Sequence, residues 1–212
     1  MEPIEEGYYY HIYNRGADRN NLFWDENDYK EFIRKYVYYL FPSIQTYSWC
    51  LMKNHFHALI RIRTVQEQSL LYNSRKELFL AGKFHGNLDP KEKPYSASKQ
   101  ISHHMNGYTR YINKKRERTG TLIEGPLKRK KIVDDKNLLH LVCYIHRNPI
   151  HHGIVKNYSD YKFSSYPDFV NNRKSFLEIG KILQGFGGLE NFICAHEEFQ
   201  LYIDNSDDIY LE

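Results

Sequence analysis

The chain has 212 residues, enough for one ordinary domain and an appendage. A hydrophobic content of 41% and a charged content of 26% exclude disorder as its main state. The acidic N-terminus lacks the apolar core of a signal peptide, and no stretch approaches the roughly 20 apolar residues of a membrane span. Three scattered cysteines argue against a disulfide framework and a cysteine-based zinc site, so we expect a cytoplasmic protein.

Charge is unevenly distributed along the chain. Residues 182–212 contain seven acids and no Lys or Arg, so the remainder carries all 30 basic residues and only 19 acidic ones. A basic body with an aromatic share of 16% suits a polyanion whose bases can stack. A solvated, lysine-rich surface would give the same composition, so charge alone does not decide between them.

The first half of the chain shows alternating strand and helix patterns. Residues 8–14 are aromatic and β-prone, and they predict a strand. Apolar residues recur at helical spacing over 29–40, and Asp25 or Asp28 can cap that helix. Residues 44–52 and 55–62 predict two strands, and the two residues between them predict a tight antiparallel hairpin.

The second half predicts a broken helical segment and then further helices. Residues 65–97 are predicted to form an insertion or mobile loop. A helix is expected to resume at Ser98 and to end before Gly120. Residues 121–123 are the short β-like piece that follows. A third helix is expected from the cap at Asp134 and Asp135 to a stop before Pro149, because the residue before proline disfavours helical geometry.

The order β-α-β-β-α-β predicts an α+β, ferredoxin-like sandwich with a central antiparallel sheet and helices on one side. Residues 1–170 would form this domain, and residues 171–212 a helical C-terminal extension with an acidic tail.

Two histidines on the strand 55–62 could hold a metal ion. Side chains alternate along a strand, so Phe56, Ala58 and Ile60 line one face while His55 and His57 line the other. Imidazoles two residues apart are about 7 Å apart along a strand and can turn toward one cation. Isolated His-X-His triplets are also common by chance, so a further ligand is needed.

Tyr144 and Asn148 are four residues apart and therefore share one face of the third helix. The amide oxygen of Asn148 could complete a metal site, and the phenol of Tyr144 could attack a phosphate held there. By spacing alone, a tyrosine packed in the core and an asparagine that ends a helix explain these residues better.

The two stretches together, in this order, resemble the single-tyrosine HUH transposases, in particular those associated with repetitive extragenic palindromes (REP). The segment His55-Phe56-His57 looks like the histidine motif of that family. Residues 144–153 are similar to its tyrosine helix, with Tyr144 at the nucleophile position and Asn148 at that of the third ligand. The resemblance spans about residues 8–168. Lys53 stands where a proline is common.

This resemblance implies cleavage and transfer of single-stranded DNA through a 5′-phosphotyrosine, with Mg²⁺ or Mn²⁺ as the metal. It implies single-stranded or hairpin DNA as the partner, a nucleoid-associated location, and either a monomer or a homodimer. His140 is a candidate general base, and packing or exposure is its simpler explanation. Eight basic residues are candidate DNA contacts: Lys114, Lys115, Arg116, Arg118, Lys128, Arg129, Lys130 and Lys131.

Two other functions fit the same residues. A non-catalytic module that binds single-stranded nucleic acid, such as a domesticated transposase relative, would bind without forming a covalent adduct. A metal-dependent hydrolase that activates water would not need Tyr144.

Overall fold

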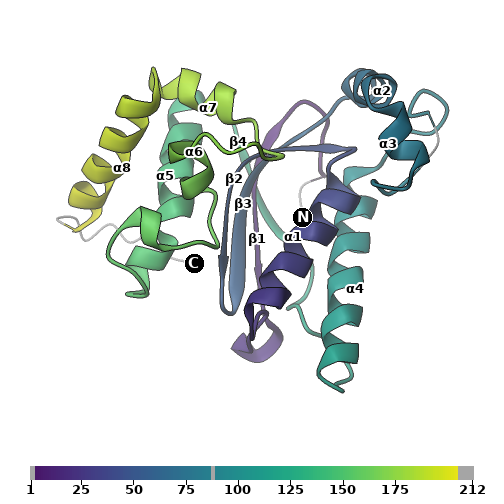
Figure 1. The fold of residues 1–212 in the computed structure, drawn as a ribbon, viewed down its shortest axis with the longest axis horizontal. Helices are drawn as coiled ribbons and strands as arrows, with labels where there is room; N and C mark the ends of the chain where they lie inside the picture. The colour runs from purple at the N-terminus through teal and green to yellow at the C-terminus, as the bar shows by residue number, and fades with distance from the viewer. Residues whose placement is uncertain (1–2, 87–88, 205–212) are drawn as a thin grey trace.

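A single antiparallel sheet forms the centre of the protein, which we describe from a computed structural model covering residues 3–86 and 89–204 (Figure 1). Its strands are β1 (Tyr9–Arg15), β2 (Ile44–Met52), β3 (His55–Ile62) and β4 (Lys128–Ile132), in the order β2-β3-β1-β4. Each strand is antiparallel to its neighbours. The predicted ferredoxin-like α+β fold is therefore confirmed.

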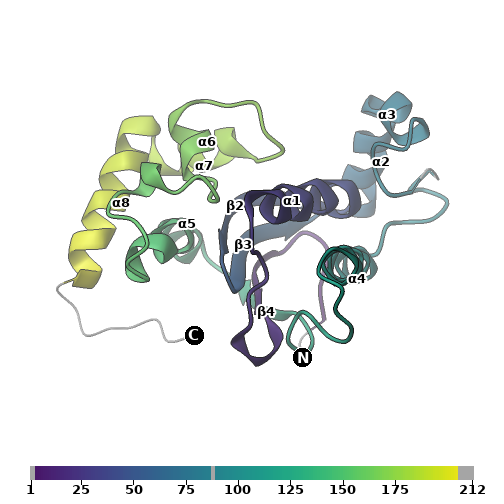
Figure 2. The same cartoon turned by 60° about the horizontal axis from the view of Figure 1, so that its bottom comes forward.

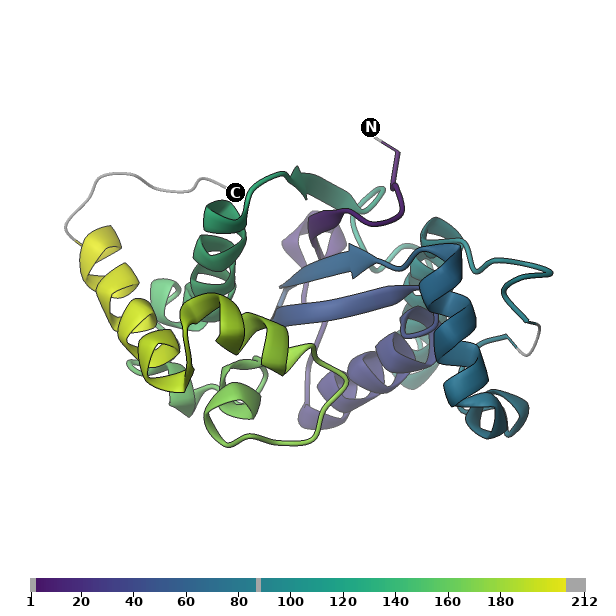
Figure 3. The same cartoon turned by 90° about the horizontal axis from the view of Figure 1, so that it is seen from above.

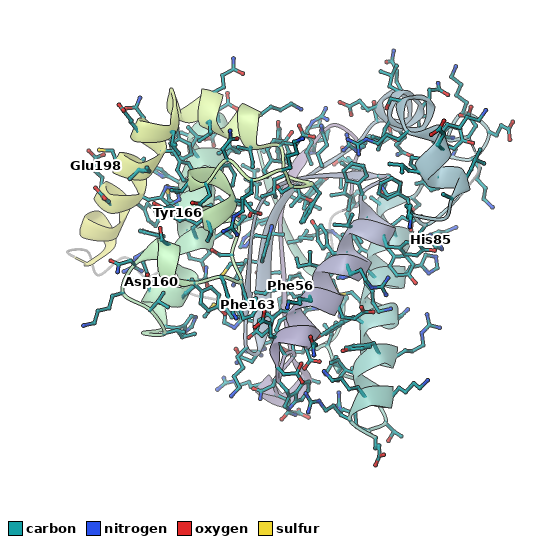
Figure 4. All side chains as sticks on the ribbon, in the orientation of Figure 1. Phe56, His85, Asp160, Phe163, Tyr166 and Glu198 are labelled. Carbon is teal, nitrogen blue, oxygen red and sulfur yellow. The ribbon has the colours of Figure 1, made fainter. Side chains whose placement is uncertain are left out.

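One face of the sheet is covered by α1 (Glu26–Leu40) and α4 (Ala97–Lys115). Helix α1 begins where predicted, because Asp25 and Asp28 form a reciprocal capping box. Phe56 of β3 lies on this side of the sheet (Figure 4). It belongs to the same core cluster as Phe32 of α1 and Tyr108 of α4. The alternation predicted for strand β3 is thus present.

The other face is covered by α5 (Asp135–His151), α6 (Tyr166–Val170), α7 (Ile179–Phe186) and α8 (Leu189–Asp204), with a 3-10 turn at Tyr158–Asp160. Figures 2 and 3 show these helices on the side of the sheet opposite α1 and α4. The expectation of helices on one side only was wrong. The central strands carry apolar side chains on this face too, including Cys50, Met52 and Leu59, and these must be buried.

Residues 65–97 include α2 (Val65–Ser74) and α3 (Lys76–Leu80), which lie beyond one end of the sheet (Figure 1). They have a small core of their own, formed by Tyr72, Phe79, Phe84 and Tyr95, which packs against Val37 and Phe41 near the end of α1.

The fourth strand is β4 and not the expected piece at residues 121–123. Ile123 forms only an isolated bridge with Gly16, whereas Lys128–Ile132 pairs with β1 over its whole length. An edge strand is held by its backbone hydrogen bonds, so a run of basic residues can form one.

Helix α5 continues through Pro149 to His151, so the predicted stop before the proline was wrong. Proline has no N–H for the carbonyl of Ile145. The side-chain amide of Asn148 donates to that carbonyl at 3.4 Å and to the carbonyl of Tyr144 at 3.0 Å. These hydrogen bonds compensate for the missing backbone donor.

Within the described residues, no helix combines the length and the apolarity needed to cross a membrane.

Candidate active site

The two histidines of β3 lie side by side on the face of the sheet that α5 covers. His55 is 9% exposed and His57 is 2% exposed, and their ring centroids are 5.2 Å apart with the planes nearly perpendicular. The tight turn at Lys53 and Asn54 fixes this register, because a shift of one residue would move both imidazoles to the opposite face.

Each imidazole is oriented through its Nδ1 atom. The Nδ1 of His57 lies 3.0 Å from the Nε2 of His11 on β1, and the Nδ1 of His55 lies 2.8 Å from the Oδ1 of Asn54. A metal held by this pair would therefore bind Nε2 of both rings. Hydrogen bonds of this kind fix the orientation of histidine ligands in metal sites.

His11 was missed by the sequence analysis. It lies between Tyr9 and Tyr13 on one face of β1, because every second residue of a strand points to the same side. This periodicity was the only feature of the sequence that could have indicated it.

Tyr144 of α5 lies beside the histidine pair. Its ring centroid is 5.9 Å from that of His57 and 6.1 Å from that of His11, and its plane is nearly perpendicular to both. The cap at Asp134 starts the helix as predicted, and α5 packs on β2 and β3. Tyr144 and the histidine pair thus come from two different layers and lie side by side.

Asn148 lies one turn beyond Tyr144 and is 2% exposed. Its Nδ2 is fixed by the two helix carbonyls, which can only accept hydrogen bonds, so the orientation of the amide is defined. The remaining oxygen, Oδ1, is the atom that could serve as a metal ligand. Asn148 does not line either of the two cavities around the histidines.

Two cavities adjoin the site and share Tyr13 and His57. The His55 cavity has a volume of about 510 Å³ and includes His55 and His152 in its wall. The Tyr144 cavity has a volume of about 390 Å³ and includes His11, His140 and Tyr144. No Asp or Glu lines either cavity within the described residues, so the chemistry of these walls favours an anionic ligand.

The predicted DNA contacts separate into groups. Lys128 lines the His55 cavity, and Lys130 and Lys131 line the Tyr144 cavity. Lys131 is also paired with Glu5. Lys115 and Arg116 bind Asp25 and Asp28 at the start of α1, so they hold two helices together.

The other three predicted contacts lie outside both cavities. Lys114 is exposed at the end of α4, and Arg118 donates to the carbonyl of Thr121. Arg129 lies between Lys128 and Lys130 on β4, so its side chain points to the opposite face of the strand from theirs. Arg19 and Lys53, which were not among the predicted contacts, both line the His55 cavity as well.

His140 is exposed and shares the wall of the Tyr144 cavity with Tyr144, one helical turn away. Its ring contacts Phe199 of α8 at a centroid distance of 6.1 Å. This position leaves the imidazole accessible to solvent.

The donor set fits a divalent cation if the amide oxygen is included. No group of three or more His, Cys, Asp or Glu side chains in the described part of the chain could hold a metal ion, so a third ligand beside the two imidazoles would have to be of another type, such as the amide oxygen of Asn148. Two nitrogens and one neutral oxygen leave coordination positions for water and phosphate oxygens, as a catalytic metal requires.

Helix α5 is tied to its surroundings by a buried chain of polar side chains. The Nδ1 of His146 lies 2.9 Å from the Nε2 of His196 on α8, and the Nε2 of His146 lies 2.7 Å from the Oγ of Ser165. His196 in turn donates from Nδ1 to the carbonyl of Phe192 at 2.7 Å. Burial lowers the pKa of both imidazoles, that of His196 to about 4. Both rings are therefore neutral at pH 7.

No family model and no curated protein sequence matches the chain. A solved structure does match it, and it is described as a REP-associated tyrosine transposase bound to a REP hairpin. The match covers 83% of this chain and 87% of that one, with a TM-score of 0.57 and 14% sequence identity. This chain has a transposase-like fold. The similarity concerns the arrangement of the elements around the sheet, and at this identity it shows the fold alone.

Proposed function

We propose that this protein is a metal-dependent endonuclease and transposase of single-stranded DNA that uses Tyr144 as its nucleophile. The observation that carries this proposal is the position of the Tyr144 ring, 5.9 Å from His57, above a pair of imidazoles that are both oriented through Nδ1. A tyrosine placed only for packing would not need two oriented histidines beside it.

His55, His57 and Asn148 are the residues that would hold the metal, through Nε2, Nε2 and Oδ1. When bound there, a divalent cation, Mg²⁺ or Mn²⁺, supplies positive charge that stabilises the phosphate as charge develops on its oxygens. His11 and Asn54 would hold the imidazoles in the tautomers that leave Nε2 unprotonated.

Tyr144 would carry out the covalent step. Its phenolic oxygen forms a bond to phosphorus as the bond from phosphorus to the 3′ oxygen breaks. The leaving oxygen takes up a proton and becomes a free 3′-OH, while the 5′ phosphate stays on the tyrosine. Because the energy of the phosphodiester is retained, another 3′-OH can reverse the step and join two strands.

The phenol must lose its proton, since its ordinary pKa is near 10. His140 shares the wall of the Tyr144 cavity and could accept that proton directly or through water.

The proposed substrate is single-stranded or hairpin DNA. The cavities on both sides of His57 have no acidic side chain in the described walls and contain Lys53, Lys128 and Lys130. The solved structure with a similar fold is bound to a REP hairpin, which supports testing hairpins of that kind first.

The test is covalent capture of labelled DNA. Single-stranded and REP-type hairpin oligonucleotides are labelled at the 3′ end or at the 5′ end and incubated with the protein and Mg²⁺ or Mn²⁺. A 5′-phosphotyrosine transfers only the 3′ label to the protein on a denaturing gel, while the 5′ label is released on a shorter strand. Tyr144→Phe should abolish the adduct, and Tyr111→Phe, on the opposite side of the sheet, should retain it.

The outcomes separate the alternatives. Cleavage without an adduct that survives Tyr144→Phe would indicate a hydrolase that activates water. Binding without cleavage in either metal would indicate a non-catalytic nucleic-acid-binding protein.

A further inference from the structure

We propose that the His55 cavity binds one unpaired nucleotide of the DNA strand, with its base stacked on Tyr13 and its phosphate bound by Arg19 and Lys128. This inference rests on the proposed function and adds a subsite next to the reacting phosphate.

Tyr13 has the properties of a stacking platform. Its ring is nearly parallel to that of His11, at 4.8 Å and 28°, and to that of His57, at 5.7 Å and 16°. A flat base can extend such a stack, because every base has a π-face. Tyr13 and His57 are also the two residues that line both cavities, so a base on Tyr13 would lie beside the metal-binding pair.

Packing does not explain this tyrosine. Tyr13 is half-buried but belongs to none of the hydrophobic core clusters. Its hydroxyl forms no hydrogen bond with any part of the chain that the structure describes. An aromatic ring that lies outside the hydrophobic clusters and lines two cavities is suited to a ligand.

Arg19 is held at the wall of the same cavity by an unusual turn. Asp18 and Arg19 both have left-handed backbone angles, with φ of 55° and 59°, which residues other than glycine rarely adopt. The turn is fixed on both sides, because Gly16 donates to the carbonyl of Asn54 at 2.8 Å and Ala17 donates to that of Leu122 at 2.9 Å. Arg19 is thus positioned beside the hairpin turn that precedes His55.

Of the cations in this wall, Arg15 is paired with Glu124, and Glu124 also interacts electrostatically with Arg19 and Lys128 without forming an ion pair with either. Among the described residues, the side chains of Arg19, Lys53 and Lys128 take part in no ion pair or hydrogen bond, and Glu124 is engaged by Arg15. Lys128 lies directly across from Tyr13 in the β1–β4 register. A base on Tyr13 would therefore have Lys128 next to it and Arg19 in the same cavity wall to bind its phosphate. The cavity volume of about 510 Å³ lies in the range of small-molecule sites.

Two oligomers of equal length separate the base contact from the phosphate contact. One is a single strand of about 20 thymidines, which exceeds the site of one small binding domain, and the other is an abasic strand with the same phosphates. Binding is measured by fluorescence anisotropy over a range of salt concentrations. The variants are Tyr13→Leu, Tyr13→Phe and Arg19→Gln, with circular dichroism to verify folding.

Tyr13→Leu should weaken binding of the thymidine strand by roughly tenfold to a hundredfold and leave the abasic strand unchanged, while Tyr13→Phe should retain both affinities. Arg19→Gln should reduce the slope of log affinity against log salt by about 0.7 for both strands, the value for one lost phosphate contact. The matched controls, Trp24→Leu and Arg110→Gln, remove an exposed ring and an exposed cation outside both cavities and should change neither quantity.

The subsite would be refuted if the wild-type protein bound the strands and Tyr13→Leu affected both equally or neither, or if Arg19→Gln left the salt slope unchanged. A wild-type protein that binds neither strand and forms no adduct would overturn the proposed function as well.

Discussion

Mild acid should destabilise the protein because three imidazoles are buried in the neutral form. His104, His146 and His196 are each at most 1% exposed. Burial lowers the pKa of His104 and that of His196 to about 4, from 6.5, and lowers the pKa of His146 in the same direction. The unfolded chain therefore binds protons at these sites before the folded one does.

The size of the effect follows from these values. The stability that each neutral imidazole contributes is present above pH 6.5. It is lost as the pH falls from 6.5 toward 4, at about 1.4 kcal/mol per pH unit for each site. At pH 5 the loss is about 2 kcal/mol for His104 and about 2 kcal/mol for His196, and His146 adds to it. A typical domain has only about 5–15 kcal/mol of stability in total.

Urea unfolding at pH 7 and pH 5 measures this difference. Carboxylates whose pKa is lowered by ion pairs, such as Glu26 and Glu31, lose their stabilising contribution only at still lower pH. His104→Gln can retain the hydrogen bond to the carbonyl of Phe32 and should reduce the pH dependence by about 2 kcal/mol. His140→Gln, which changes an exposed ring, should leave it unchanged. Equal stability at the two pH values in the wild type would refute this reasoning.

Three further predictions concern the candidate site. His11→Leu should weaken Mn²⁺ binding by about 10- to 100-fold in calorimetry, because the Nδ1 of His57 loses its partner, whereas a similar loss in the control His151→Leu would contradict that role. Asn148→Ala should lower the free energy of unfolding by about 1–3 kcal/mol, since two helix carbonyls lose a donor, and urea titration measures this. Lys128→Gln should weaken DNA binding and reduce its salt dependence, whereas Lys115→Gln should mainly lower the melting temperature. The reverse result would contradict the division of the basic residues into cavity-lining and helix-bridging ones.

The sequence predicts best those elements that depend on local patterns. The hairpin at Lys53 and Asn54 follows from two β-prone runs separated by only two residues, and the start of α1 follows from the cap at Asp25. The histidine pair and Tyr144 follow from their motif and from the order of the elements. Their proximity requires the whole sheet and was expected only through the family resemblance.

The features that were missed depend on contacts between distant residues. Strand β4 has no apolar alternation, and only its pairing with β1 defines it. The hydrogen bond between His11 and His57 joins residues 46 positions apart. Lys115 and Lys128 look alike in the sequence, but an acidic cluster more than 80 residues away neutralises the first and not the second. A local pattern cannot contain this information.

The open edge of β4 has a consequence for solubility. The edge of β2 is covered by residues 163–165 and 177–178, whereas no strand among the described residues pairs with the outer side of β4. Unsatisfied backbone groups at such an edge invite a second molecule to add its own strand and start aggregation. Four consecutive cations, Lys128–Lys131, repel a like-charged copy and discourage that association. The same charges that would contact DNA in the proposed function thus also discourage separate molecules from joining their sheets.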